Sequence, residues 1–482
     1  MSEPKNWPNR AQPWFLLWVA TGLGCAPTDH VVGELRGGQL SGVTAGSGGE
    51  MAGGGERAGG AIAGGGMGSS PGGTADSVPP GRSGAGSVGG SPEANAGTAG
   101  LGSPSAGTGA LPPTGPITES SFWPVIGYET GAGPRSLALG DLDANGQLDL
   151  AVANVDENSV SVLLHDSTGF VSPVDYANGA RPGWVALQDL NSDGTLDLAL
   201  TSIQSKSVMV LPGRGDGTFG PVGENPTPQS VSSLVLGDVN NDGNWDIVAA
   251  PNGDLTQPES ADSSFVSVFL GDGSGAFAAP QLVAPGKDCF SVALGDVDHD
   301  GKLDLARLDA RSDTVSVLLG NGDGTFRSSQ EYATGKAPVF VTFADLDDDG
   351  QLDLLTADSA SNEVSVLLGL NGGTFAPRAA YRSGESPHHL SVADLNGDRH
   401  PDLITANVSD VGVSILQGVG DGSFAPKVDY SAAADFDDRP ESRATAVADL
   451  NGDGAPDFVV ATARPNSKLP SGVLVFLALT SR

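Results

Sequence analysis

The sequence has few of the groups that cross-link small exported domains or bind anionic partners. Its 482 residues include only two cysteines, Cys25 and Cys289, which lie in regions of very different composition. A disulfide framework is therefore excluded, and Cys289 is interpreted as a buried, inert thiol. Lysine and arginine number 24 against 58 aspartates and glutamates, for a formal net charge of -34. We expect no nucleic-acid partner, because the phosphate contribution to affinity would be repulsive, and we expect cations as ligands.

Long hydrophobic runs are also missing. The apolar stretch Trp14–Gly24 is too short to span a membrane but suits the core of a signal peptide, and two basic residues precede it. Residues 1–25 are thus predicted to be an export signal, with the mature protein secreted or held at the cell surface. The end of this stretch resembles a bacterial lipoprotein processing site, although Gly22 stands where leucine is usual. Two alternatives remain for Cys25: a lipidated residue that tethers the protein to the outer membrane, or an unmodified residue near an ordinary cleavage site.

Large apolar residues are nearly absent from the tract that follows. Residues 26–120 consist mainly of glycine, alanine, serine, proline and threonine, with runs such as Ala52–Gly55. This composition buries too little apolar surface to offset the entropy of ordering the chain, so a disordered linker is predicted. A coil of about 80 such residues spans roughly 50 Å, enough to hold a C-terminal domain clear of an envelope surface.

Seven copies of a nine-residue acidic pattern, here called acidic loops 1–7, occupy the rest of the chain. Positions 1, 3, 5 and 9 are always aspartate or asparagine, and position 6 is glycine except in loop 6, which has Arg399. Successive first residues are 48, 49, 58, 49, 49 and 55 residues apart. Loop by loop, positions 1, 3, 5 and 9 are Asp141, Asp143, Asn145 and Asp149; Asp189, Asn191, Asp193 and Asp197; Asp238, Asn240, Asp242 and Asp246; Asp296, Asp298, Asp300 and Asp304; Asp345, Asp347, Asp349 and Asp353; Asp394, Asn396, Asp398 and Asp402; and Asp449, Asn451, Asp453 and Asp457.

Short runs rich in β-branched residues flank the acidic loops, and no stretch has helical periodicity. In the first unit these runs predict strands at 136–140, 148–153, 159–164 and 170–176. A repeat of about 50 residues with several short strands is typical of a β-propeller blade. Residues 121–482 are therefore predicted to form an all-β, seven-bladed propeller of four-stranded blades, expected to be monomeric.

The seventh unit is incomplete at its C-terminal end. The fourth strand of other units carries a phenylalanine and a tyrosine six residues apart, as in Phe326 and Tyr332, but the last unit stops at Val473–Leu477. The missing copy lies at the front, as Phe122–Tyr128. We predict that this N-terminal strand completes the last blade, which closes the ring and removes an exposed sheet edge.

The acidic loops have the composition of calcium sites. Hard oxygen ligands at alternating positions, a turn-permitting glycine and a final carboxylate suit Ca²⁺, with a backbone carbonyl near position 7 as a further ligand. The alternative is that aspartate, asparagine and glycine simply favour turns. However, 23 of the 28 positions are aspartates, and two unit charges about 4 Å apart repel by roughly 4 kcal/mol at an effective dielectric constant of 20. Up to seven bound Ca²⁺ ions are therefore predicted.

The repeats resemble the FG-GAP/VCBS-type units of calcium-binding propellers, such as the head of integrin α subunits. The family's motifs survive in part, as Phe219-Gly220 and as Gly335–Pro338. Unlike in an EF-hand, no acidic residue occupies position 12, which is Val152 in loop 1, and strands flank the loop. The resemblance implies that the acidic loops bind Ca²⁺ on one face and that ligands usually meet the opposite face. Acidic loops in all seven units place the chain nearer the bacterial members.

The opposite face is expected to carry any recognition surface. Two extra segments, 251–264 and 431–442, fall there, and insertions gathered on one face suggest recognition, although tolerated drift explains them equally well. Residues that precede the first strands are expected around the channel mouth, where they either hold a sugar or peptide or simply pack the entrance. They are Arg135, Trp184, Phe290, Phe340, His388, His389 and Arg443. The tripeptide Arg214–Asp216 is interpreted as a by-product of the repeat.

Three functions remain open from the sequence. The first is a non-enzymatic, calcium-binding module for adhesion to an extracellular glycan or protein. The second is a propeller enzyme of the polysaccharide lyase or hydrolase type, with His388, His389 or Arg443 at the channel mouth. The third is a scaffold without a specific ligand. No catalytic motif was found, which favours the first.

Overall fold

The computed structural model describes residues 115–118, 121–122, 126–177, 181–252, 264–286, 288–409, 412–431, 441–464 and 471–479. The predicted export signal, Cys25, most of the predicted linker and the centres of both extra segments, 253–263 and 432–440, lie outside these residues. All regular structure in the described part is β-strand, and no helix there is long and apolar enough to cross a membrane.

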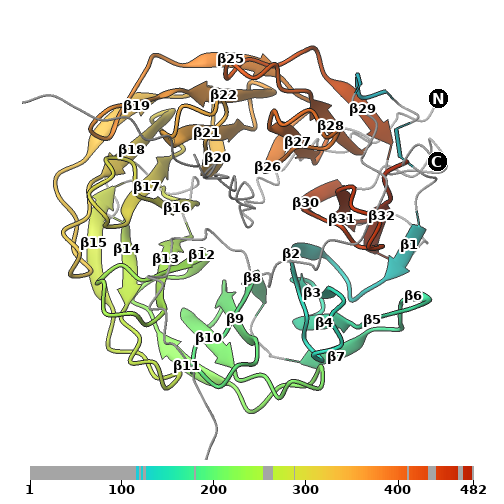
Figure 1. Ribbon diagram of the computed structural model, residues 1–482. Coiled ribbons are helices and arrows are strands. Elements are labelled where there is room, and N and C mark those ends of the chain that lie inside the picture. The colour runs from blue at the N-terminus through green and yellow to red at the C-terminus, as the bar shows by residue number, and fades with distance from the viewer. Residues whose placement is uncertain are drawn as a thin grey trace, which may run out of the picture. The chain divides into compact units, whose positions relative to one another are not determined.

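Each repeat folds into one four-stranded antiparallel sheet, and seven sheets form the ring of blades in Figure 1. Blade 1 contains β2 (Pro134–Gly140), β3 (Asp149–Asn154), β4 (Ser159–Leu163) and β7 (Val174–Ala177); blade 2 contains β8 (Pro182–Gln188), β9 (Asp197–Ser202), β10 (Ser207–Leu211) and β11 (Gly223–Pro226). Blade 3 contains β12 (Val231–Gly237), β13 (Asp246–Pro251), β14 (Ser264–Phe269) and β15 (Gln281–Gly286); blade 4 contains β16 (Val292–Gly295), β17 (Asp304–Asp309), β18 (Thr314–Leu318) and β19 (Gln330–Ala333).

The remaining blades follow the same order from the centre outward. Blade 5 contains β20 (Pro338–Ala344), β21 (Asp353–Asp358), β22 (Glu363–Leu367) and β25 (Ala379–Arg382); blade 6 contains β26 (Pro387–Ala393), β27 (Asp402–Asn407), β28 (Gly412–Leu416) and β29 (Val428–Ser431). Blade 7 contains β30 (Glu441–Ala448), β31 (Asp457–Ala463), β32 (Gly472–Phe476) and β1 (Ile126–Glu129). Two short hairpins, β5 (His165–Asp166) with β6 (Gly169–Phe170) and β23 (Gly369–Leu370) with β24 (Thr374–Phe375), lie outside the blades.

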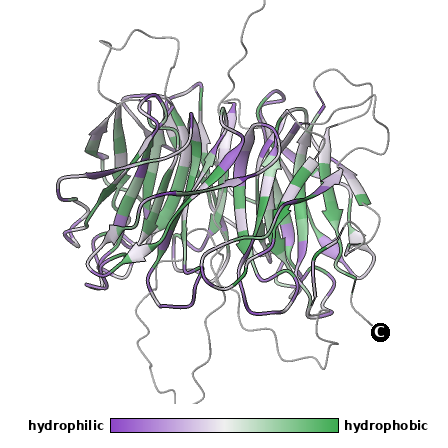
Figure 2. Ribbon diagram, turned by 90° about the horizontal axis from the view of Figure 1, so that it is seen from above, coloured by the Kyte–Doolittle hydropathy of each residue, from purple (hydrophilic) through white to green (hydrophobic). Residues whose placement is uncertain are grey.

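The second strand of each blade is buried along its whole length. All six residues of β3 and of β21, for example, are buried. A strand covered on both faces by neighbouring sheets reads as a continuous apolar run rather than as an alternating one. Figure 2 shows the same division, with hydrophobic strands inside and hydrophilic residues concentrated in the connections at both ends. The core is therefore built mainly from contacts between blades.

The predicted closure of the ring is confirmed. Strand β1 pairs with β32 in antiparallel register, from Ile126 opposite Val475 to Glu129 opposite Gly472. Phe122 forms a further bridge with Ala478. The first strand of the propeller thus completes the sheet that the last strands begin, and β1 lies beside β32 in blade 7 (Figure 1).

The predicted fourth strand is wrong in its boundaries. The stretch 170–176 contains the end of β6 and the start of β7, separated by three residues outside any strand. Phe170 pairs back with His165, whereas Tyr176 lies on β7 opposite Val160. The prediction failed because the recurring phenylalanine and tyrosine do not lie on the same strand.

The phenylalanine of one blade instead packs against the tyrosine of the preceding blade. Their rings meet edge to face with centroids 5.2–5.5 Å apart, a geometry that aromatic pairs prefer. The pairs are Tyr128 with Phe170, Tyr176 with Phe219, Tyr332 with Phe375, Tyr381 with Phe424, and Tyr430 with Phe122. Phe122 and Tyr128 occupy both ends of this series, which identifies them as the aromatic pair of blade 7.

Candidate metal centres

All seven acidic loops connect the first and second strands of their blades, so they lie at one end of the sheets, as predicted. Their backbones share two left-handed residues. Position 4 has φ between 56° and 73° and position 6 between 72° and 88° in every loop, and the lowest value at position 6 is that of Arg399. Glycine adopts this conformation readily and other residues pay a steric penalty. The sequence pattern revealed this requirement at position 6 but not at position 4, where alanine, serine, asparagine, histidine and aspartate also occur.

The position 1 carboxylate organises the turn. Its Oδ2 accepts a hydrogen bond from the backbone N–H of position 6 at 2.8–2.9 Å in all seven loops. The position 5 side chain likewise accepts from the N–H of position 7 at 2.7–3.1 Å. These bonds wrap the backbone around the side-chain oxygens and turn them toward the middle of the loop.

The position 9 aspartate ties the loop to the blade. Its Oδ2 accepts the N–H of position 2 at 2.7–3.0 Å. Its Oδ1 accepts, at 2.7–2.8 Å, the N–H of a residue that follows the third strand. All seven aspartates are buried. The sequence singled these residues out as ligands and missed that each also bridges three backbone segments.

Burial and the neighbouring carboxylates raise the pKa of these aspartates. The pKa rises to about 6 at Asp149, Asp246 and Asp304 and to about 7 at Asp353, Asp402 and Asp457, mainly through burial and further through the aspartates of the same loop. The pKa of Asp197 is raised for the same reasons. Without a compensating cation, each loop therefore holds a carboxylate whose ionised form is disfavoured.

Three loops bring three carboxylates together. One oxygen from each lies within 4.8 Å of the others in the sets Asp141, Asp143 and Asp149; Asp296, Asp298 and Asp300; and Asp345, Asp347 and Asp353. The other four loops have asparagine at position 3 and thus fewer carboxylates to converge. The predicted residues are close neighbours within each loop, but the loops differ in charge.

Loop 5 is the most anionic. Asp348 adds a fifth carboxylate to its four predicted residues, and within the described part of the chain no lysine or arginine pairs with Asp347, Asp349 or Asp353. Burial, followed by Asp349, raises the pKa of Asp347. The Oδ1 atom of Asp347 is buried and accepts no hydrogen bond from the described residues. A buried carboxylate oxygen without a donor is suited to a cation.

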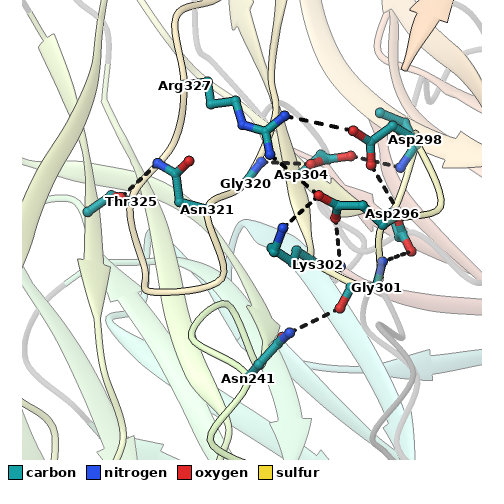
Figure 3. Close-up of polar contacts among 12 residues, drawn as sticks. Asn241, Asp296, Asp298, Gly301, Lys302, Asp304, Gly320, Asn321, Thr325 and Arg327 are labelled. Atoms are coloured by element: carbon teal, nitrogen blue, oxygen red, sulfur yellow. Dashed lines mark hydrogen bonds and ion pairs between the residues drawn. The ribbon is translucent and has the colours of Figure 1, made fainter. Parts of the chain in front are cut away.

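Loop 4 has cationic side chains of its own (Figure 3). Lys302 Nζ lies 2.7 Å from Asp300 Oδ2, and Arg327 reaches across from the next connection to 3.4 Å from the same oxygen. Arg327 also approaches Asp298 Oδ2 at 4.0 Å. These groups partly neutralise the loop, so an added cation would gain less there than in loop 5.

Loop 6 contacts the segment that precedes the propeller. Asn396 Nδ2 donates to Gly115 O at 3.0 Å and to Asp398 Oδ2 at 2.9 Å. Ile117 is buried, and its N–H donates to Gln417 Oε1 at 3.1 Å. The position 3 amide of loop 6 is therefore already engaged with backbone from residues 115–118.

The residues expected around the channel mouth are largely buried. Six of them have relative exposures of 5% or less: Arg135, Trp184, Phe290, Phe340, His388 and His389. His389 Nδ1 accepts the N–H of Thr445 at 3.1 Å, and the His389 ring packs 4.6 Å from that of Phe340. Burial lowers the pKa of Arg443 to about 10. Of the two alternatives, this geometry favours packing of the channel over an open ligand site.

Two further sequence features have plain structural surroundings. Arg214–Asp216 lies in an exposed turn, where the Asp216 carboxylate accepts from the backbone N–H of Thr218 at 3.0 Å. The neighbouring bridge between Gly213 and Phe219 recurs in other blades. Cys289 is fully buried, as predicted, and burial raises the pKa of its thiol.

Comparisons with known proteins agree with this geometry. The family model of the FG-GAP-like repeat matches residues 141–200, 189–249, 255–307, 308–356, 345–405 and 394–460. No curated protein sequence matches the chain significantly.

Among solved structures, a complex of BBS1N with ARL6DN matches with a TM-score of 0.53 and 10% identity over 76% of this chain and 98% of that one. A lectin from Agrocybe aegerita that recognises non-reducing terminal N-acetylglucosamine matches with a TM-score of 0.44 and 20% identity over 72% of this chain and 85% of that one. At these identities the structural likenesses concern the fold alone. The repeats, the seven blades and the family match together establish that the chain belongs to the FG-GAP-like repeat family.

Proposed function

We propose that the acidic loops bind Ca²⁺ and that the chain is an exported, non-enzymatic binding module for an extracellular glycan or protein. The observation that supports calcium most directly is the buried Oδ1 of Asp347, which accepts no hydrogen bond from the described residues and belongs to a group of three converging carboxylates. Carboxylate and amide oxygens are the ligands that Ca²⁺ prefers. The residues present in loop 5 therefore fit the ion.

Hydrogen bonds within the chain orient the side chains of each acidic loop before a cation binds. Positions 1 and 5 are oriented by backbone N–H groups of the loop, and position 9 is held by N–H groups from two other segments. The side chains thus lose little conformational freedom when a cation binds. A bound Ca²⁺ would supply the positive charge that offsets repulsion among the aspartates and would favour their ionised forms.

The loops should differ in affinity. Loop 5 has the largest negative charge and is expected to bind most tightly. Loop 4 should bind more weakly, because Lys302 and Arg327 compete for Asp298 and Asp300. Loop 6 should be weakest, because Arg399 replaces the glycine at position 6 and adds a positive charge to the loop.

A binding role without catalysis is supported by the burial of His388 and His389, the histidines that an enzyme at the channel mouth would use. A general acid or base must come within hydrogen-bond reach of its substrate. The two large connections, between β13 and β14 and between β29 and β30, leave the blades at the end opposite the acidic loops. We place the ligand surface on that face.

Calcium titration calorimetry of the chelator-treated protein tests the metal assignment. Asp347→Asn gives loop 5 the asparagine that four other loops have at position 3, so it should lower the calcium affinity of the tightest site. Asp166→Asn, which alters an exposed carboxylate in the β5–β6 turn outside the acidic loops, should leave it unchanged. Two outcomes would contradict calcium binding at loop 5: wild type releases no heat on titration with calcium, or wild type and Asp347→Asn give identical titrations.

The binding role is tested separately by glycan arrays and by incubation with polysaccharides. Retention of a glycan without product formation is expected. Turnover that disappears in His389→Ala, while the variant keeps its fold, would favour the enzyme instead.

A further inference from the structure

We propose that a polar cavity between blades 5 and 6 binds a carboxylate-bearing sugar unit, of the hexuronic acid type. The cavity has a volume of about 370 Å³ and is lined by Ser361, Asn362, Arg382, Ser383, Gly384, Glu385 and Lys427. Its walls are the β21–β22 turn and the connection from β25 to β26, both at the end of the blades opposite the acidic loops, together with Lys427, which precedes β29. Pockets that hold small ligands occupy about 300–1,000 Å³.

The preceding blade junction shows why a cavity is present here. Arg378 pairs with Glu363 of the same blade, blade 5, at 2.5 Å and donates at 3.3 Å to Thr334 O, which lies in the connection from blade 4. Lys336 pairs with Asp313 at 2.5 Å. Two ion pairs therefore close that junction with side chains of the protein itself.

The strand registers locate the equivalent residues one blade later. Glu363 opposite Arg382 in blade 5 corresponds to Gly412 opposite Ser431 in blade 6. Lys427 accordingly takes the place of Arg378 without its acidic partner, because Gly412 has no side chain. In the same alignment Glu385 replaces Lys336 and Asn362 replaces Asp313. Among the described residues, neither of these closing ion pairs has a counterpart between blades 5 and 6.

The cavity keeps charged groups that are available to a ligand. Among the described residues, neither the Arg382 guanidinium nor the Glu385 carboxylate makes a side-chain hydrogen bond or ion pair, and both side chains are exposed. Lys427 is held by Asp429, at 2.5 Å. Asn362 uses its Oδ1 to accept the N–H of Ser386 at 2.8 Å, which leaves its amide N–H groups as donors.

These groups define the chemistry of the ligand. A guanidinium binds a carboxylate through two parallel hydrogen bonds, which is the role proposed for Arg382. Glu385 accepts hydrogen bonds, and so can the Ser383 hydroxyl, which itself donates to Gly384 O at 3.2 Å. The rest of the ligand should therefore carry hydroxyl groups. A hexuronic acid combines one carboxylate with several hydroxyls on a compact ring. Because the Asp429 carboxylate already pairs with Lys427, Arg382 is the cation that holds the carboxylate of the ligand.

The ligand assignment rests on the proposed binding function and names its site, but it is independent of calcium at the acidic loops. The test is isothermal titration calorimetry of the full chain, saturated with calcium, against glucuronate and galacturonate. Glucose serves as the neutral sugar and acetate as the free carboxylate. At least one uronate should bind, glucose should not, and acetate should bind at least tenfold more weakly than the uronate.

Arg382→Gln should weaken uronate binding by about 10- to 100-fold, because it removes a charge-assisted hydrogen-bond donor. Lys427→Gln should weaken it less, because Asp429 already pairs with the Lys427 ammonium. Lys336→Gln, the matched control, breaks the ion pair at the preceding junction and should leave uronate affinity unchanged. Melting temperatures of the three variants establish that each one is folded.

The outcomes separate this site from the wider binding role. Absence of uronate binding, or equal affinity in wild type, Arg382→Gln and Lys427→Gln, overturns the cavity assignment. If glycan arrays then reveal another glycan that Arg382→Gln still binds, the proposed binding function stands and only its assignment to the cavity between blades 5 and 6 is wrong. Acetate that binds as tightly as the uronates would also overturn the sugar assignment.

Discussion

Replacement of Asp353 by asparagine should destabilise the propeller even when no calcium is present. Asp353 Oδ2 accepts the N–H of Leu346 at 2.9 Å, and Oδ1 accepts the N–H of Gly369 at 2.7 Å. The side chain therefore joins acidic loop 5, strand β21 and the segment after β22 from a buried position. An asparagine has one acceptor oxygen, so its NH₂ group must face one of the two backbone donors.

The magnitude follows from these two bonds. One charge-assisted hydrogen bond is lost, worth about 1.5–3 kcal/mol, and one buried N–H is left without an acceptor at a cost of about 1–3 kcal/mol. Asparagine is neutral, so it also avoids the cost of burying an ionised carboxylate, which is the main cause of the raised pKa of Asp353. This relief and the lower repulsion within loop 5 offset most of the loss, which leaves about 1–2 kcal/mol. At about 2 °C per kcal/mol for a large domain, the melting temperature should fall by roughly 2–4 °C.

Circular dichroism melts in EDTA at pH 8 measure this effect. Asp349→Asn is the matched control, because Asp349 is exposed and its single bond, to the N–H of Gln351 at 2.7 Å, can be kept by an amide oxygen. Its melting temperature in EDTA should match wild type. If Asp353→Asn and Asp349→Asn melt at the same temperature as wild type, position 9 does not tie the loop to the blade.

Three other predictions concern stability. In EDTA the melting temperature should fall as the pH is raised from 5 to 8. In six loops the pKa of the position 9 aspartate is about 6 to 7 in the folded state, which is above its value in the unfolded chain. The contribution of these aspartates to stability is therefore complete below about pH 4 and is lost as they ionise in the folded state. A flat profile would contradict the raised pKa values, and saturating calcium should remove the fall. Deletion of residues 122–130 should abolish cooperative unfolding near the wild-type temperature, because β32 loses its partner; an unchanged melt would refute closure by β1. Arg399→Gly should raise the melting temperature slightly, since glycine accepts the φ of 72° without strain; a decrease of several degrees would show that the arginine side chain stabilises loop 6.

Much of the fold could be predicted because the repeat is local. Each acidic loop predicts the connection between two strands. The position of Phe122 and Tyr128 before the first repeat, rather than after the last, indicates how the ring closes. The boundaries of the outer strand could not be predicted, because Phe170 and Tyr176 contact different blades. The six-residue spacing of the phenylalanine and the tyrosine in the sequence does not indicate that they contact different blades.

The candidate site was likewise only partly predictable from the sequence. The ligand pattern within each loop is local and was visible in the sequence, whereas the bonds from position 9 to residues that follow the third strand are not. Burial of His389 depends on how closely the inner strands meet around the axis. The cavity at Arg382 arises from two ion pairs that are absent from one junction, a difference visible only after the strands are aligned in register.

The most direct measurement is the melting temperature of the propeller in excess EDTA and in millimolar calcium at pH 8. Each loop that binds with calcium at about 100 times its dissociation constant adds about 2.7 kcal/mol to the stability of the folded state. Several such loops should raise the melting temperature by well over 10 °C, with a reduced shift in Asp347→Asn. Identical melting temperatures with and without calcium would contradict the proposal that these loops are metal sites.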